Sequence, residues 1–199
     1  FGWASPEHAF WIGVDVNDTD PAIAFDDNGW AMAVWVRKFL NGTKVVVNRL
    51  WNGTDWIGVE EPLVPMPNNW PGNASLPEIT FTSNEASVPG LTPHQAVAMW
   101  TDWNRTAAQF RIYYSIWNGQ NWTDAVGAYS VEEIPGQTVN AALNGIPATF
   151  RNGISSDRLG NANAVWATNN LAGQLYYSIW NGSSWTNAAP ILGSEGYMP

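Results

Sequence analysis

One six-residue pattern, Trp-Asn-Gly-x-x-Trp, occurs three times in the chain and constrains its fold more than any other feature. The copies begin at Trp51, Trp117 and Trp180, at spacings of 66 and 63 residues. A pattern that recurs at a nearly fixed period is typical of repeat architectures. The 199 residues are therefore expected to contain three copies of one structural unit.

Two further landmarks precede each copy in the same order. An Ala-x-Ala-x-Trp pattern occupies residues 31–35, 96–100 and 162–166. Before it comes a triplet that ends in Phe, at residues 23–25, 79–81 and 148–150. Three landmarks in a constant order indicate one repeated unit rather than chance.

Each unit is predicted to form four short strands. The first ends at the Phe, the second is the Ala-x-Ala-x-Trp segment, and the third covers residues 45–51, 111–117 or 174–180. In the second copy Ile112, Tyr114 and Ile116 alternate with the residues between them, which is the period of two of a strand. The Asn-Gly pair supplies the positive φ of a tight hairpin turn. The second Trp of the pattern should then begin the fourth strand.

Tandem four-stranded antiparallel meanders with regular Trp and Gly predict an all-β fold of β-propeller blades. The expected boundaries are 21–66, 77–135 and 146–193 for three blades, 1–20 for the last strand of a preceding blade, and 194–199 for the lead-in to another. Residues 11–15 support the leftover strand because they nearly repeat residues 56–60. Three blades do not close a ring, so we expect further blades of the same chain or other subunits as partners.

The hairpin also resembles a known motif. Ser115-x-Trp117-x-Gly119-x-x-Trp122 and its counterpart from Ser178 to Trp185 are similar to the Asp-box of sialidase-like propellers, Ser-x-Asp-x-Gly-x-x-Trp. The chain departs from that motif at the Asp, and the first copy has Arg49 in place of Ser. The repeats also look like those of bacterial and archaeal cell-surface propellers. The resemblance implies a structural hairpin and a surface protein.

Charge and hydropathy exclude two classes of partner. The net charge is −9 with only 8 Lys and Arg, whereas nucleic acids and anionic membranes attract clustered positive charge. No apolar run approaches the roughly 20 residues that a membrane-spanning helix needs. We therefore expect neither nucleic-acid binding nor membrane insertion.

Acceptor triplets for N-glycosylation are unusually frequent. Chance predicts about 2.6 from the Asn, Ser and Thr content, whereas the chain has seven. They begin at Asn17, Asn41, Asn52, Asn73, Asn104, Asn121 and Asn181. Turn-rich proteins are also rich in Asn, Ser and Thr, but the excess favours an extracellular or cell-surface glycoprotein.

No residue pattern indicates a catalytic site, a metal or a cofactor. A sialidase-like mechanism would need a cluster of three arginines, a nucleophilic Tyr with a Glu, and an acidic Asp. The chain has six Arg together with Tyr and Glu, but these residue types occur in any protein of this size. His8 and His94 lack a second ligand at metal-binding spacing. The acidic run 15–20 could bind calcium, but it lacks the Gly and closing Glu of an EF-hand loop, so an interblade loop is the default.

The repeated Trp residues should pack between blades because they recur in register. Four unrepeated ones are the candidates for ligand or partner contacts: Trp3, Trp30, Trp70 and Trp103. The sequence thus predicts a non-catalytic extracellular propeller that serves as scaffold, adhesin or assembly subunit. A carbohydrate-binding propeller is the alternative, and a sialidase-like glycosidase comes third.

Overall fold

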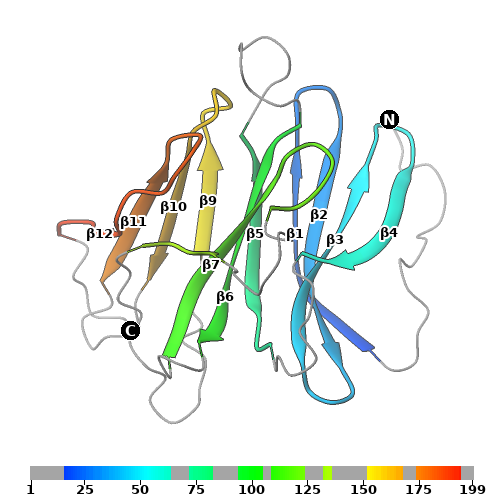
Figure 1. Ribbon diagram of the computed structural model, residues 1–199, viewed down its shortest axis with the longest axis horizontal. Coiled ribbons are helices and arrows are strands. Elements are labelled where there is room, and N and C mark those ends of the chain that lie inside the picture. The colour runs from blue at the N-terminus through cyan, green and yellow to red at the C-terminus, as the bar shows by residue number, and fades with distance from the viewer. Residues whose placement is uncertain are drawn as a thin grey trace.

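The computed structural model describes residues 16–63, 72–82, 94–104, 109–123, 132–135, 152–167 and 174–193. These residues form three antiparallel sheets of four strands, and in each sheet the strands follow one another in chain order. The sheets lie side by side like an open fan (Figure 1). The all-β prediction of three four-stranded meanders is confirmed, and we call the sheets blades 1, 2 and 3.

Each blade contains the strands that its landmarks predict. Blade 1 consists of β1 (Val16–Phe25), β2 (Ala31–Phe39), β3 (Lys44–Trp51) and β4 (Trp56–Pro62). Blade 2 consists of β5 (Ser75–Phe81), β6 (Ala96–Asn104), β7 (Gln109–Trp117) and β8 (Glu132–Glu133). Blade 3 consists of β9 (Asn152–Ser156), β10 (Ala162–Ala167), β11 (Leu175–Trp180) and β12 (Ala189–Pro190). The first strands of the blades are neighbours, with β5 between β1 and β9 (Figure 1).

The repeated hairpins are held by their own side chains. In blade 2, Asn118 Oδ1 accepts hydrogen bonds from the backbone amides of Gln120 and Asn121 at 3.0 and 2.8 Å. Gly119 takes a φ of 91°, which a residue with a Cβ adopts at a cost. The rings of Trp117 and Trp122 then meet across the turn at 5.6 Å. The Asn-Gly pair and the Trp pair therefore stabilise the same turn from two sides.

A hydroxyl clamp closes the hairpins of blades 2 and 3. Ser115 Oγ donates to the carbonyl of Thr123 at 2.8 Å, and Thr123 Oγ1 accepts from the amide of Ile116 at 3.0 Å. Ser178 and Thr186 form the same pair of bonds in blade 3, at 2.7 and 3.0 Å. These bonds give partners to backbone groups at the end of each hairpin.

Blade 1 lacks both halves of this clamp. Arg49 occupies the Ser position and Ile57 the Thr position, so the two hydroxyls are lost together. Blade 1 has a continuous β4 beginning at Trp56 instead. In blades 2 and 3 the second Trp makes only an isolated bridge to the first, and the fourth strands β8 and β12 come later and are two residues long. The prediction that the second Trp begins the fourth strand is thus confirmed for blade 1 alone.

The Ala-x-Ala-x-Trp strands pack one blade on the next. Ala96, Ala98 and Trp100 are buried against Met32 and Val34 of blade 1. In blade 3 the corresponding residues, Ala162, Ala164 and Trp166, are buried against blade 2. Alanine at alternate positions lets the sheets approach closely, and the Trp fills the wider space beside them. The predicted burial of the repeated Trp35, Trp100 and Trp166 is confirmed.

Three sequence-based positions differ from the structure. The first strand of blade 3 ends at Ser156, which pairs with Ala162 as Phe25 pairs with Ala31, so its predicted end at Phe150 was wrong. Residues 16–20 belong to β1, so blade 1 begins at or before Val16 rather than at residue 21, and this segment is a strand instead of an interblade loop. Blade 2 begins at Ser75 rather than at residue 77.

The expected leftover strand at residues 11–15 and the lead-in at 194–199 lie outside the described residues. Within the described ranges, no helix is long and apolar enough to cross a membrane.

Candidate functional site

A polar cluster lies at one end of the blades, around the turn between β1 and β2. Asp26 begins this turn, and its Oδ1 accepts from the amides of Asn28 and Trp30 at 2.9 and 2.8 Å. A carboxylate at the first position of a tight turn commonly caps the following amides in this way. Gly29 supplies the positive φ, at 82°. The turn therefore fixes the position of the Asp26 carboxylate.

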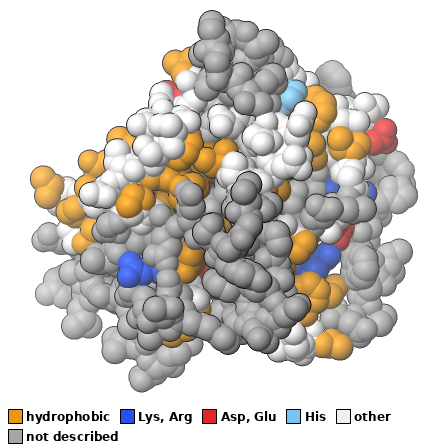
Figure 2. Space-filling model, in the orientation of Figure 1, with side chains coloured by type: hydrophobic (Ala, Val, Ile, Leu, Met, Phe, Trp, Pro, Cys, Tyr) orange, Lys and Arg blue, Asp and Glu red, His pale blue; other side chains and the backbone are white. Residues whose placement is uncertain are grey.

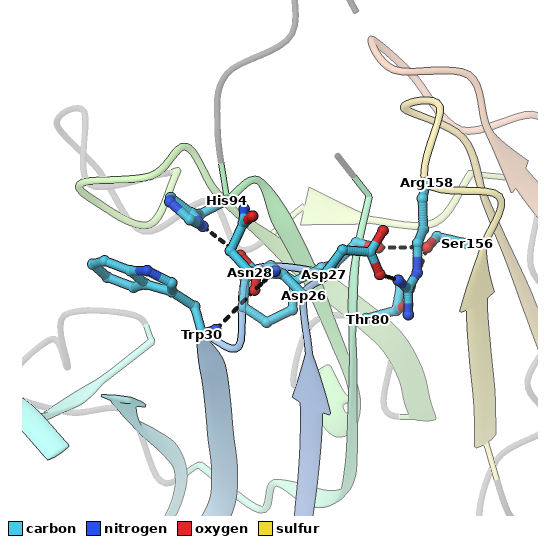
Figure 3. Close-up of polar contacts among 9 residues, drawn as sticks. Asp26, Asp27, Asn28, Trp30, Thr80, His94, Ser156 and Arg158 are labelled. Carbon is cyan, nitrogen blue, oxygen red and sulfur yellow. Dashed lines mark hydrogen bonds and ion pairs between the residues drawn. The ribbon is translucent and has the colours of Figure 1, made fainter. Parts of the chain in front are cut away.

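The second carboxylate oxygen of Asp26 binds a residue of blade 2. Its Oδ2 lies 2.5 Å from Nδ1 of His94, which precedes β6 (Figure 3). The His94 ring also stacks on Trp30 at a centroid distance of 4.5 Å. The Asp26 side chain is only 1% exposed and that of His94 24% exposed. A buried carboxylate thus orients the imidazole, and the pair joins blades 1 and 2.

Blade 3 has an equivalent turn between β9 and β10. Asp157 Oδ1 accepts from the amides of Leu159 and Asn161 at 2.7 and 3.1 Å, and Gly160 has a φ of 101°. The side-chain amide of Asn161 donates to Asp157 Oδ2 at 2.6 Å. This last bond is the main reason that the pKa of Asp157 is lowered. The sequence signal for both turns is Asp-x-x-Gly-x immediately before the Ala-x-Ala-x-Trp pattern.

Contacts from this second turn reach both other blades. Arg158 forms an ion pair with Asp27 of blade 1 (Figure 3). The amide of Gly160 donates to the carbonyl of Thr82 at 2.7 Å, and Ser156 Oγ donates to the carbonyl of Phe81 in blade 2. The three turn regions are therefore tied to one another at this end.

The chemistry available here is that of an oriented His–Asp pair. Such a pair could act as a general base if a nucleophile or substrate lay within about 3 Å of the outer imidazole nitrogen. However, Asp26 is already bound by two amides and the histidine, and His94 is packed on Trp30. The His94–Asp26 and Arg158–Asp27 contacts of the cluster each connect two blades. Among the described residues, no group of three or more His, Asp or Glu side chains could hold a metal ion.

A separate ionic cluster lies on the face of blade 1 that points away from blade 2. Arg37 is buried and binds Asp18 through Nε and a terminal nitrogen at 2.8 and 2.7 Å. A terminal nitrogen of Arg37 also lies 2.6 Å from Oε2 of Glu60. The other carboxylate oxygen of Glu60 lies 3.9 Å from a terminal nitrogen of Arg49. The hydrogen bond to Asp18 is the main reason that the pKa of Arg37 is raised, and burial acts against it.

The arginines of the described residues do not form the triad of a sialidase-like site. Arg37 and Arg49 approach the same Glu60 on the outer face of blade 1, whereas Arg111 lies opposite Asp102 in blade 2 and Arg158 belongs to the β9–β10 turn. Asp18 of the acidic run 15–20 is engaged by Arg37, and this observation accounts for one of the candidate calcium ligands. Arg105 and Arg151 lie outside the described residues.

The predicted acceptor Asn residues lie in turns and on strands. Asn17, Asn41, Asn121 and Asn181 are exposed, and Asn52 and Asn73 are half-buried. Asn52 and Asn181 occupy equivalent hairpin turns, where each Oδ1 accepts two backbone amides. The carbonyl oxygen carries these bonds and the side-chain nitrogen would carry a glycan, so turn and modification are compatible. The side chain of Asn104 lies outside the part of the chain that the structure describes.

The candidate contact residues divide into three groups. Trp30 is half-buried beside His94, at the polar end described above. Trp103 is half-buried and packs edge-on against Phe110 at 5.1 Å, on the core between blades 2 and 3. Trp3 and Trp70 lie outside the described residues. Sequence reasoning considered His94 only as a metal ligand and Asp26 only as part of a hairpin turn, and it missed their pairing, which joins two segments far apart in the chain.

Comparison with solved structures finds the same fold. A GH93 α-L-arabinofuranosidase of Fusarium graminearum, solved with arabinobiose, is similar with a TM-score of 0.54 and 9% identity over 91% of this chain and 50% of that one. A protein of unknown function from Dyadobacter fermentans gives a TM-score of 0.53 and 15% identity, over 90% of this chain and 56% of that one. The chain is built of propeller blades. It spans about half the length of these structures.

These likenesses establish the fold alone. No protein-family model matches the sequence, and no curated protein matches it.

Proposed function

We propose that the chain is a non-catalytic part of an extracellular glycoprotein propeller, which serves as a scaffold, adhesin or assembly subunit at a cell surface or filament. The proposal rests on how the polar side chains around the β1–β2 and β9–β10 turns are used. Asp26, His94, Asp27 and Arg158 bind one another across blades. Groups committed to holding sheets together are what a scaffold needs, whereas an enzyme site leaves such groups available for substrate.

The extracellular part of the proposal rests on the acceptor triplets. Of the six acceptor Asn side chains that the structure describes, four are exposed: Asn17, Asn41, Asn121 and Asn181. We expect the intact mass of protein from a secreting eukaryotic host to fall on enzymatic deglycosylation. Asn181→Gln should remove one glycan, whereas Asn163→Gln, at an exposed Asn outside any triplet, should remove none. An unchanged mass on deglycosylation would contradict the glycoprotein proposal.

The non-catalytic part is tested against the chemistry of the similar arabinofuranosidase. We expect no hydrolysis of an aryl α-L-arabinofuranoside and no calorimetric binding of arabinobiose. Hydrolysis that is abolished by His94→Ala but kept in Asn163→Gln would show that the polar end is an active site. Selective binding on a glycan array, lost in Trp30→Ala, would favour the carbohydrate-binding alternative instead.

A further inference from the structure

On the face of blade 3 that points away from blade 2, β11 carries a row of partly exposed apolar side chains beside the polar Ser155 of β9 and Asn163 of β10. Because strand residues alternate between faces, Tyr176, Ser178 and Trp180 of β11 point toward blade 2, and Leu175, Tyr177 and Ile179 point away from it. Leu175 is 36% exposed and Ile179 is 37% exposed. Hydrophobic side chains gather over this part of the molecule in the space-filling view (Figure 2).

Blade 2 shows what this face looks like when it is covered. The Trp-Asn-Gly turns align β7 with β11, so Ile112, Tyr114 and Ile116 are the equivalents of Leu175, Tyr177 and Ile179. These three are only 2%, 8% and 7% exposed. The side chains that cover them come from blade 3.

The covering side chains are the repeated landmarks. The ring centroid of Tyr114 lies 6.0 Å from that of Trp180 and 5.6 Å from that of Trp185. Ala162, Ala164 and Trp166 belong to the same cluster of buried side chains. The blade 2–blade 3 contact is therefore a fit between an Ile-Tyr-Ile face and an Ala-x-Ala-x-Trp face. Blade 3 repeats the first half of that fit on its outer side, with Leu replacing one Ile.

We propose that the outer face of blade 3 is a docking surface for a further blade that presents an Ala-x-Ala-x-Trp strand and a paired-Trp hairpin, as blades 2 and 3 do. The inference deepens the assembly role proposed above and rests on it. It names the chemistry of the partner, which is an aromatic and small-residue face without charge at the contact.

Blade 1 of a second copy also has an Ala-x-Ala-x-Trp strand and a paired-Trp hairpin, but its outer face differs from the corresponding faces of blades 2 and 3. Its corresponding face carries Arg49 where blades 2 and 3 carry the buried Ser115 and Ser178. The ionic cluster of Arg37, Asp18 and Glu60 lies on the same face. The Trp35 side chain of this face is already buried, at 5% exposed. Packing Tyr177 and Ile179 on Asp18 and Arg49, whose side chains are 34% and 23% exposed, would remove the water that they retain, which is costly. The outer face of blade 3 therefore favours a further blade like blades 2 and 3 over head-to-tail pairing of two copies of this chain.

The test adds the missing blade. In a tandem variant, residues 143–193 are repeated after residue 199, so the connection keeps the length found between β8 and β9. We expect the tandem to unfold at a midpoint at least about 4 °C higher than the chain alone. Peptides containing Leu175–Trp180 should exchange amide hydrogens more slowly in the tandem. Ile179→Lys should abolish both gains while changing the midpoint of the unextended chain little, because Ile179 is exposed there.

The matched control is Ile23→Lys, at a β1 residue that is 52% exposed and outside the proposed surface. It should leave the gain of the tandem intact. Equal effects of the two substitutions, or a tandem without slower exchange in Leu175–Trp180, would overturn the proposal. Concentration-dependent dimers of the unextended chain that Ile179→Lys abolishes would also overturn it, because the occupant would then be a second copy. None of these readouts depends on glycans or hydrolysis, so this inference can fail while the proposed function holds.

Discussion

Nδ1 of His94 lies 2.5 Å from Oδ2 of Asp26, so a residue of the second blade completes the first turn of the first blade. Because the carboxylate is buried, removing the histidine leaves its Oδ2 without this partner, whereas Oδ1 keeps the two backbone amides of the turn. The bond therefore contributes to stability as an interblade contact. The first prediction measures that contribution.

We expect His94→Ala to lower the free energy of unfolding by about 1–3 kcal/mol, as for loss of a partner of a buried polar group. Asp26→Asn should also destabilise, and the double variant should cost less than the sum of the two. Urea unfolding of the four proteins gives the coupling energy. The control cycle pairs His94→Ala with Asp157→Asn, in an equivalent turn without a histidine, and should be additive. Additivity in the first cycle would mean that the His94–Asp26 bond contributes nothing.

The second prediction concerns the buried Trp of the second strand. Trp100→Ala should lower the free energy of unfolding by about 3–5 kcal/mol, because it opens a cavity between blades 1 and 2. Leu40→Ala, at a residue that is 80% exposed, should change it by less than about 0.5 kcal/mol. Thermal and urea unfolding measure both. Unfolding of Trp100→Ala at the wild-type midpoint would contradict the packing of the blades described above.

The third prediction tests the hydroxyl clamp. Ser178→Ala removes the donor to the carbonyl of Thr186, in a position with no exposure, and should cost about 1 kcal/mol. Ser155→Ala, at an exposed serine of β9, is the control and should cost almost nothing. Hydrogen exchange should show faster exchange at Ile179, whose amide donates to Thr186. If the two variants were equally stable, the clamp would not contribute to the hairpin.

The fourth prediction is a pH dependence of the β9–β10 turn. The side-chain amide of Asn161 lowers the pKa of Asp157 below its ordinary value of 3.8. A lowered folded-state pKa stabilises the turn at pH above the unfolded pKa, and this contribution is lost as the pH falls through the folded pKa. NMR titration of the Asp157 carboxyl should give a pKa below 3.8, and Asn161→Ala should raise it. The neighbouring Asn163→Ala should leave it unchanged; a similar shift in both variants would contradict the assigned cause.

The repeats predicted the parts of the fold that depend on local sequence. The second and third strands and their hairpins were located correctly because Asn118-Gly119 and its counterparts specify the turn within a few residues. The end of the first strand of blade 3 was misplaced at Phe150, because aromatic triplets were matched where the turn signal, Asp157 to Gly160, was the better guide. The fourth strands β8 and β12 depend on pairing that no local pattern specifies.

The candidate site could not be predicted from the sequence for a similar reason. His94 lies in a connection that has no equivalent in the other blades, and it reaches Asp26 only after blades 1 and 2 have packed together. Of the four unrepeated Trp residues, Trp30 lies at that cluster and Trp103 is part of the core. Repetition reveals what every blade needs for packing. It carries no information on contacts that occur once.

The ion pair between Asp27 and Arg158 links the first blade directly to the third. In linear repeat proteins each unit touches only its neighbours, and units at an end can unfold one at a time. Here the inner strands converge, so the turns of blades 1 and 3 meet at one end although blade 2 separates them in the chain. Loss of blade 3 then weakens blade 1 as well. The three sheets are expected to melt as one cooperative unit, with equal calorimetric and van't Hoff enthalpies.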